Sequence, residues 1–434
     1  MDLAPLELGA IGAVVLFILG ALGMRIAYAA GLVGTLGLVA ILGVEGGLRT
    51  AGTVPYARGV SYSLSVLPMF ILLGYLAHYA GISVGVFEAC RRWFGRLPGG
   101  LATATIFAVA GFGAVSGSSA AAAAVFSKVA IPEMLRERYS KALAAGSVAA
   151  GSVLDSIIPP STLLVVYAII TEQSVAALLV AGFVPGIISA LAYGAIITVM
   201  AIRNPEFAPR TRRYSWPEKV RSVPGVLPIL VIICTIFTAM FYGWATPTEA
   251  GALAASFVFV LALANRTRFA EFKEAFLETA RLTVVIFTIV WSIMIFVLFL
   301  GYANLPSFIA SWVEGMDVSP LVILLVIYLI YLVLGMFIDS IGIMMLTLPI
   351  VFPIVTNLGY DPVWFGVVIV KLCGIGLLSP PFGLCCFVVN SVRPDIPVQT
   401  VFRGVMPFIL TDIIVVGILT AFPEIITFIL SHSI

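Results

Sequence analysis

The chain has 434 residues, of which 61% are hydrophobic and only 10% are charged. Soluble domains carry about 25% charged residues, so this composition excludes a cytosolic enzyme and a disordered chain. Continuous apolar runs, such as 227–240 and 321–334, also differ from the alternating strands of outer-membrane barrels. A net charge of +2 and two histidines give no basis for nucleic-acid binding or for histidine-ligated metals. At about 20 apolar residues per transmembrane helix, the length predicts roughly ten to twelve spans.

The first half of the chain carries a polar turn inside an apolar stretch. Residues 101–113 and 120–130 are each too short to span a bilayer, and Ser116-Gly117-Ser118-Ser119 joins them. Two short helices joined in this way predict a re-entrant hairpin near residues 101–131. Its hydroxyls, carbonyls and helix C-termini suit Na⁺, whereas a helix N-terminus would favour an anionic substrate group. Close packing of small residues between helices is the alternative explanation.

A Pro-Pro pair follows the hairpin. Pro159-Pro160 interrupts an apolar run and predicts a broken helix near residues 143–170, because proline cannot continue the helical hydrogen-bond ladder. The carbonyl groups freed before the break need partners, and a cation at the hairpin tip could supply one. Asp155 lies just before the break, where an ionisable group at membrane depth is a candidate functional residue. A plain proline kink, and an Asp155 near the membrane interface, are the alternatives.

A polar segment separates the two halves of the chain. Residues 203–224 form a basic linker that is expected on the cytoplasmic side. Its basic residues are Arg203, Arg210, Arg212, Arg213, Lys219 and Arg221. Farther along, residues 265–281 place aromatic side chains on one helical face, which predicts either a short helix lying in the membrane interface or an ordinary connecting helix.

The second half repeats the plan of the first half. Five features recur 221 residues later, or 222 for the last: Pro132 and Pro353, Tyr139 and Tyr360, Ser119 and Ser340, Pro159-Pro160 and Pro380-Pro381, Pro185 and Pro407. The spacing predicts two repeats, residues 1–202 and 225–434. The second repeat is expected to hold a hairpin near 321–356 and a broken helix near 363–392. Interrupted helices at corresponding places in two halves indicate a transporter site.

Two more ionisable residues lie in apolar surroundings in the second half. Asp339 coincides with the polar turn of the second hairpin and is the strongest candidate of the three. Lys371 precedes the second break, and two interpretations of it stay open. Its ammonium group could meet a substrate carboxylate, or it could pair with an acidic side chain.

Together these segments resemble the large membrane subunit of TRAP transporters, the tripartite ATP-independent periplasmic transporters. The resemblance covers nearly the whole chain and rests on the order and spacing of nine segments: 67–74, 97–100, 116–119, 131–134, 158–161, 181–186, 246–250, 335–339 and 379–383. It implies an all-α polytopic membrane protein, an elevator-type transporter with two inverted repeats, re-entrant hairpins and Pro-Pro-broken helices. It implies a transport protein of the bacterial inner membrane, not an enzyme, without an organic cofactor.

The resemblance also implies a substrate class and partners. The expected activity is Na⁺-coupled uptake of a small organic acid, a carboxylate or a sulfonate, delivered by a periplasmic binding protein. A small four-helix membrane subunit is expected as a separate chain, since 434 residues leave no room for it. The alternative is a stand-alone Na⁺- or H⁺-coupled organic anion symporter of the same fold, which needs no binding protein.

Carried onto this sequence, the resemblance places sodium where the hairpin tips meet the helix breaks. The residues implied for sodium are Ser116, Gly117, Ser118, Ser119, Pro159 and Ser161 in the first half, and Gly335, Asp339, Ser340, Ser379 and Pro380 in the second. The candidate substrate contacts are Ser118, Asp155, Lys371 and Pro381. The chain departs from many relatives at 372–374 and at Cys385-Cys386, where polar residues are expected, so no relative's substrate is transferred.

Overall fold

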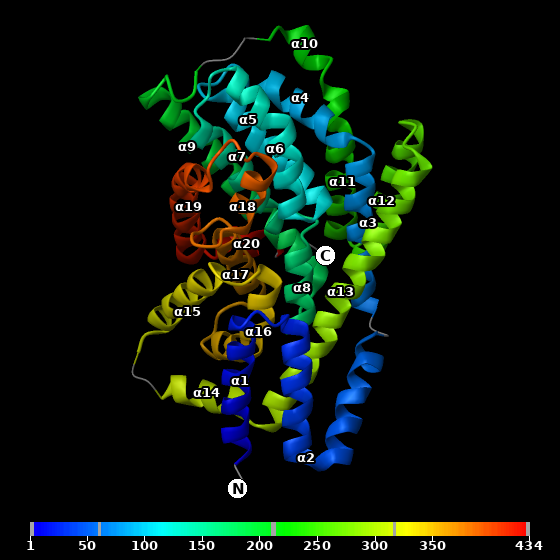
Figure 1. Cartoon of the computed structure of the whole chain (residues 1–434), viewed down its shortest axis with the longest axis vertical. Coiled ribbons are helices and arrows are strands. Elements are labelled where there is room, and N and C mark those ends of the chain that lie inside the picture. The colour runs from blue at the N-terminus through cyan, green and yellow to red at the C-terminus, as the bar shows by residue number, and fades with distance from the viewer. Residues whose placement is uncertain (1–3, 60–61, 210–213, 316–317, 431–434) are drawn as a thin grey trace.

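The computed structural model describes residues 4–59, 62–209, 214–315 and 318–430, and the regular elements of these residues are all helices (Figure 1). Among the described residues, seven helices are long and apolar enough to cross a membrane. The number is eight if α3 (Val66–Tyr79) and α4 (Ile82–Phe94), which are bent by 73° at a short break, count as one span. The all-helical membrane fold is thereby confirmed.

The number of long helices is lower than the ten to twelve spans that chain length predicts. Four of the five shorter apolar helices are single arms of a hairpin or of a broken helix, so they do not cross a bilayer one by one. These four are α5 (Gly100–Ser116), α8 (Thr162–Thr171), α15 (Pro320–Gly335) and α17 (Pro362–Gly376). The estimate from length counts such arms as full spans.

Long helices near the N-terminus and in the middle of the chain pack side by side. The 34-residue helix α13 (Phe269–Tyr302) packs on α2 (Ile26–Gly59), which is interrupted at Gly43 by a non-helical backbone conformation with a φ of 76°, and α1 (Pro5–Ala21) also packs on α2. Helix α12 (Pro247–Ala264) lies along α3, and α3 also contacts α13 (Figure 1). These helices form one flank of the molecule.

The structure corrects the prediction of a short helix at 265–281. Phe269 begins α13, which continues to Tyr302, and the Glu271 side chain accepts the backbone N–H of Arg268 at 2.8 Å at its start. Of the predicted apolar face, Phe272 is buried, but Phe269 and Phe276 are exposed. The helix does not stop because neither glycine nor proline interrupts the sequence before Gly301.

The two repeats have matching elements. In the first repeat, α5 is followed by α6 (Ser119–Arg136), α7 (Lys141–Ser152), the short 3-10 helix η2 (Val153–Ser156), α8 and α9 (Val175–Arg203). In the second repeat, α15 is followed by α16 (Ser340–Asn357), α17, α18 (Leu384–Val392) and α19 (Val398–Ala421). The second arms of the hairpins begin at Ser119 and Ser340, and both Pro-Pro peptide bonds are cis. The sequence repeat is therefore a structural repeat.

The hairpins approach from opposite ends of the molecule. Figure 1 shows α5 and α6 in the upper part of the molecule and α15 and α16 in the lower part. The remaining described helices are the 3-10 helix η1 (Tyr62–Ser65), α10 (Trp216–Val220), α11 (Val223–Phe241), α14 (Leu305–Glu314) and α20 (Glu424–Leu430). Of the basic linker, Arg210, Arg212 and Arg213 lie outside the described residues.

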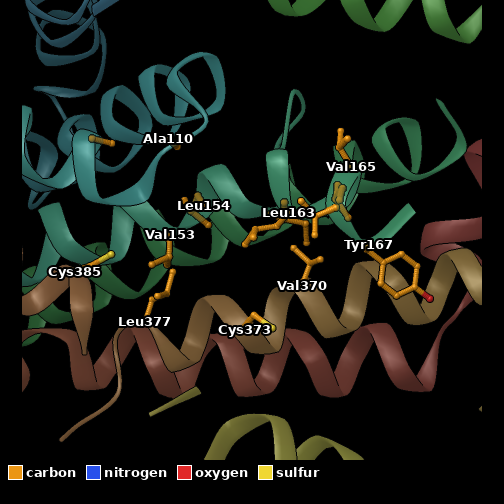
Figure 2. Close-up of a cluster of buried hydrophobic side chains, with 14 of the residues drawn as sticks. Ala110, Val153, Leu154, Leu163, Val165, Tyr167, Val370, Cys373, Leu377 and Cys385 are labelled. Carbon is orange, nitrogen blue, oxygen red and sulfur yellow. The ribbon is translucent and has the colours of Figure 1, made fainter. Parts of the chain in front are cut away.

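The two broken helices pack against each other in the core. Figure 2 shows Val153 of η2 beside Leu377 at the end of α17, within a buried cluster that also holds Cys373 and Cys385. The cluster includes Tyr167 of α8, whose hydroxyl donates to the Pro362 carbonyl at 2.7 Å. Because both breaks share this core, the two hairpin sites are built on one packed unit.

Candidate ion and substrate site

The first hairpin turns at a glycine and two serines. Helix α5 ends at Ser116, and Gly117 has a φ of 61°, a left-handed conformation that glycine adopts without steric cost. Ser118 is extended and is the N-cap of α6, where its Oγ accepts the N–H of Ala121 at 3.3 Å. A side chain at position 117 would also lie 3.0 Å from Cγ2 of Thr162. The tip is thus pressed against the start of α8.

Two hydrogen bonds join the first tip to the first broken helix. The Ser119 hydroxyl donates to Oδ1 of Asp155 at 2.6 Å, and the Thr162 hydroxyl donates to the Gly117 carbonyl at 3.2 Å. Asp155 is only 4% exposed. The structure thereby brings together Gly117, Ser119 and Asp155, three of the residues expected in the first half. Thr162 was missed, although its place directly after Pro159-Pro160-Ser161 was a signal that could have found it.

Ser161 stabilises the break itself. Its hydroxyl donates to the Ser156 carbonyl, one of the groups freed by the break, and accepts the N–H of Leu164 at 3.2 Å as the N-cap of α8. Pro159 is buried beside it, while the Ser116 hydroxyl bonds its own helix at the Gly113 carbonyl at 3.2 Å. One of the carbonyl groups that were expected to need a cation therefore already has a hydrogen-bond donor, the Ser161 hydroxyl.

The second hairpin uses a different set of side chains. Asp339 is the N-cap of α16, and its Oδ2 accepts the N–H of Gly342 at 3.2 Å. The neighbouring Ser340 is 5% exposed, and its buried Oγ has no hydrogen-bond partner among the described residues. Ser379 bonds back to the Ile375 carbonyl at 2.8 Å, and Pro380 and Pro381 are exposed. An orphaned buried hydroxyl is costly unless a ligand or an ion satisfies it.

Gly335 lies at the closest approach between the second hairpin and the second broken helix. A Cβ on Gly335 would lie 2.9 Å from the Gly376 Cα, so the backbones of α15 and α17 are in direct contact. The Ser340 hydroxyl and the Asp339 carboxylate both stand within five residues of this contact. The second hairpin tip therefore packs against the second break, just as the first hairpin tip packs against the first break.

Cavities adjoin both hairpin tips. One of about 520 Å³ is lined by Ser116 and Ser118 at the first tip. Two others, of about 320 and 230 Å³, are both lined by Asp339 of the second tip and by Arg25. Volumes of 300–1,000 Å³ are typical of small-molecule sites. Hydroxyls, carbonyls and one carboxylate per tip are the oxygen ligands that hard cations take.

Lys371 forms a buried ion pair. Its Nζ lies 2.6 Å from Oδ1 of Asp412, and the two side chains are 3% and 1% exposed. The Tyr193 hydroxyl donates to the other carboxylate oxygen at 2.6 Å, and the Lys371 ammonium lies over the Tyr193 ring. The structure therefore favours the pairing interpretation of Lys371 over the substrate contact. Asp412 and Tyr193 were missed, because only the folded chain brings α9, α17 and α19 together.

Comparison with known proteins is consistent with this architecture. The family described as "Tripartite ATP-independent periplasmic transporter, DctM component" matches residues 13–425. The crystal structure of the Alcanivorax borkumensis YdaH transporter aligns with a TM-score of 0.58 at 16% identity, covering 88% of this chain and 90% of that one. At this identity the likeness shows the fold alone.

Relatives in bacteria carry transporter names. The C4-dicarboxylate TRAP transporter large permease protein DctM of Pseudomonas aeruginosa is 34% identical over 84% of this chain and 85% of its own length. The sialic acid TRAP transporter large permease protein SiaM of Vibrio cholerae is 32% identical with the same coverage. The isethionate TRAP transporter permease protein DctMQ of Oleidesulfovibrio alaskensis is 29% identical, and the match takes 58% of its length. The chain therefore belongs to the DctM family of TRAP transporter large permease subunits and is a multi-pass membrane transport protein, not an enzyme.

Proposed function

We propose that this permease subunit couples inward movement of Na⁺ to uptake of a small organic acid across the bacterial inner membrane by an elevator mechanism. The observation that carries the proposal is the docking of each hairpin tip on a Pro-Pro break. At the first tip this contact consists of two hydrogen bonds, one from the Ser119 hydroxyl to the Asp155 carboxylate and one from the Thr162 hydroxyl to the Gly117 carbonyl. Such broken backbone is tolerated in a membrane only where it is buried in protein or lines a cavity.

The residues present fit a sodium ion at each tip. At the first tip, the Asp155 carboxylate and the hydroxyls of Ser119 and Thr162 are oxygen ligands held on three different elements, η2, α6 and α8. At the second, the Ser340 hydroxyl is buried without a partner next to the Asp339 carboxylate. A bound Na⁺ would supply positive charge to both carboxylates and a ligand to the orphaned hydroxyl.

The names of the relatives support the substrate class. Relatives named for C4-dicarboxylates, for sialic acid and for isethionate all carry small organic acids, either carboxylates or a sulfonate. The cavities at the hairpin tips have volumes suited to such solutes. The chain would take one member of this class, delivered from the periplasm by a soluble binding protein.

The names of the relatives support a small membrane subunit as a partner. This chain corresponds to about 85% of the length of relatives named large permease proteins, but to 58–60% of two that are named permease proteins without that qualifier. Membership of a family of large permease subunits supports a small membrane subunit as the partner of this chain. The basic end of α9 would face the cytoplasm, so the first hairpin would enter from that side.

A melting experiment tests the sodium sites without any substrate. The purified protein, with its small subunit, is melted in increasing NaCl and in KCl and choline chloride at matched ionic strength. We expect a saturable rise in Tm with Na⁺ alone, because a ligand at 100 times its Kd stabilises the folded state by about 2.7 kcal/mol. We expect Ser118→Ala and Asp339→Ala to weaken that rise and to impair Na⁺-dependent uptake in liposomes, with normal membrane insertion.

The control is Ser256→Ala, which removes an exposed serine of α12 that bonds only its own helix, at the Ala252 carbonyl. Equal rises in all three salts, or unchanged Na⁺ dependence in both site variants, would reject the sodium assignment. Substrate uptake into liposomes that needs no binding protein would instead support the stand-alone symporter.

A further inference from the structure

The cavity at the first hairpin tip has walls from three separate parts of the chain. Its volume is about 520 Å³, and residues of α3, of the hairpin arm α6 and of the first turns of α13 line it. Ser118 of the tip lines it, so anything bound there lies next to the proposed first sodium site. The polar side chains that line it are not distributed evenly.

One wall is cationic or neutral. Lys128 of α6 is exposed to the cavity ten residues after Ser118, and it forms no ion pair among the described residues. His78 of α3 lines the cavity and is close enough to Lys128 for the two groups to interact electrostatically. An unpaired ammonium beside an imidazole is suited to an anionic group.

A second wall, on α13, is anionic. Glu274 and Glu278 stand one turn apart on α13 and both line the cavity. The Arg281 guanidinium lies 2.6 Å from Glu278 but 3.8 Å from Glu274, so Glu274 keeps more of its capacity to accept hydrogen bonds. Tyr79 of α3 also lines the cavity, within electrostatic range of both carboxylates.

We propose that this cavity binds the transported solute and that its two walls select for an organic acid with one anionic end and hydrogen-bond donors at the other. The anion would lie against Lys128 and His78, and hydroxyl or ammonium groups would donate to Glu274 and Glu278. A dicarboxylate would have to place its second negative charge against Glu274, which is a costly juxtaposition. The proposal rests on the proposed function in that the solute is taken to be an organic acid.

Four acids of six carbons each test the selection. Gluconate has hydroxyl donors, 6-aminohexanoate has an ammonium donor, adipate has a second carboxylate, and hexanoate has an apolar end. Binding is measured on the purified protein in saturating NaCl, as the dose-dependent shift in Tm and by calorimetric titration. We expect gluconate or 6-aminohexanoate to bind at least tenfold more tightly than both adipate and hexanoate.

Variants of the two walls assign the ends of the ligand. Lys128→Gln is expected to weaken the binding of the preferred acid roughly tenfold. Glu274→Gln is expected to reduce the difference in affinity between that acid and adipate, because it removes the repulsion between Glu274 and the second carboxylate of adipate. Lys273→Gln is the matched control, since Lys273 is an exposed residue of α13 that does not line the cavity. Before any ligand is added, each variant is checked to have the same melting temperature as the wild type.

The outcomes separate this proposal from the sodium proposal. Preference for adipate, wild-type affinity in Lys128→Gln, or no binding of any of the four acids by a protein that still shows its Na⁺-specific rise in Tm would overturn the assignment of the cavity. The expected order of the acids without a Na⁺-specific rise would uphold the cavity and reject the sodium sites.

Discussion

The two hairpin sites share a backbone plan but not a set of side chains. At the first tip the N-cap is Ser118 and the carboxylate, Asp155, comes from the broken helix. At the second tip the N-cap is Asp339, 221 residues after Ser118, and the position matching Asp155 is Gly376. Each site therefore has one carboxylate, but it is carried by the hairpin in one and by the broken helix in the other.

Packing explains why the carboxylate cannot sit in the same place twice. A Cβ on Gly376 would lie 2.6 Å from the Gly335 Cα, so the second break has no room for a side chain at this position. In the first repeat the residue facing Asp155 is Gly113, where an added Cβ would lie 3.0 Å from the Asp155 Cβ. In the first repeat only the hairpin side of this contact is a glycine, whereas in the second repeat both sides are glycines. What the repeat preserves is the charge near each tip and the close contact, not the residue.

A second difference concerns charge in the core. Lys371 of the second repeat is matched by Ala150 in the first, so the ion pair with Asp412 has no counterpart there. The first repeat therefore has no charged residue at this position, whereas the second repeat includes a buried charge pair. Three predictions test how much each difference matters.

The largest expected effect is on stability, from breaking the buried pair. Lys371→Met leaves the Asp412 carboxylate buried beside Tyr193 without a cation, and we expect a loss of about 3–5 kcal/mol in the free energy of unfolding. Lys371→Met with Asp412→Asn removes both charges and keeps an acceptor for Tyr193, so most of the loss should be recovered. The measurement is thermal and denaturant unfolding in detergent, with exposed Lys273→Met as the control. A double variant no more stable than the single one would show that the pair is not what stabilises this contact.

The next effect comes from filling the contact between the hairpin and the break. Gly376→Ala forces a methyl group against Gly335, and overpacking of this kind costs about 1–3 kcal/mol. Gly417→Ala on α19 is the matched control, because nothing lies within 4 Å of its added Cβ. The readout is the difference in Tm between the two alanine variants. Equal Tm values would mean that the second tip does not depend on this close approach.

The smallest effect is on ion affinity, and it tests whether the two carboxylates are equivalent. Asp155→Asn and Asp339→Asn keep the shape of each side chain, and asparagine still serves as an N-cap at position 339. We expect each variant to raise the Na⁺ concentration for half-maximal stabilisation about tenfold, which is about 1.4 kcal/mol. Tm without Na⁺ should change little in Asp339→Asn. An effect in only one variant would assign sodium to a single tip.

Much of the architecture could be predicted from the sequence because its signals are local. Proline and glycine act on their own backbone, so the Pro-Pro breaks and the turn at Gly117 were found where the structure has them. The 221-residue spacing also paired Ser119 with Ser340, the residues at which α6 and α16 begin in the structure. The prediction of a short helix at 265–281 was wrong, since the polar start of a long helix has the same pattern as a short interfacial helix.

The sequence by itself determined the class of the protein, its two repeats and the position of both polar tips, because composition, hydrophobic runs and helix breakers act over a few residues. Tertiary structure decided which side chains meet. It paired Ser119 with Asp155 and Lys371 with Asp412, and it left the Ser340 hydroxyl without a hydrogen-bond partner in the part of the chain that the structure describes. It also assembled a charged cavity from α3, α6 and α13, whose residues are as much as 200 positions apart. Contacts over such distances depend on how helices pack, and no local pattern in the chain records them.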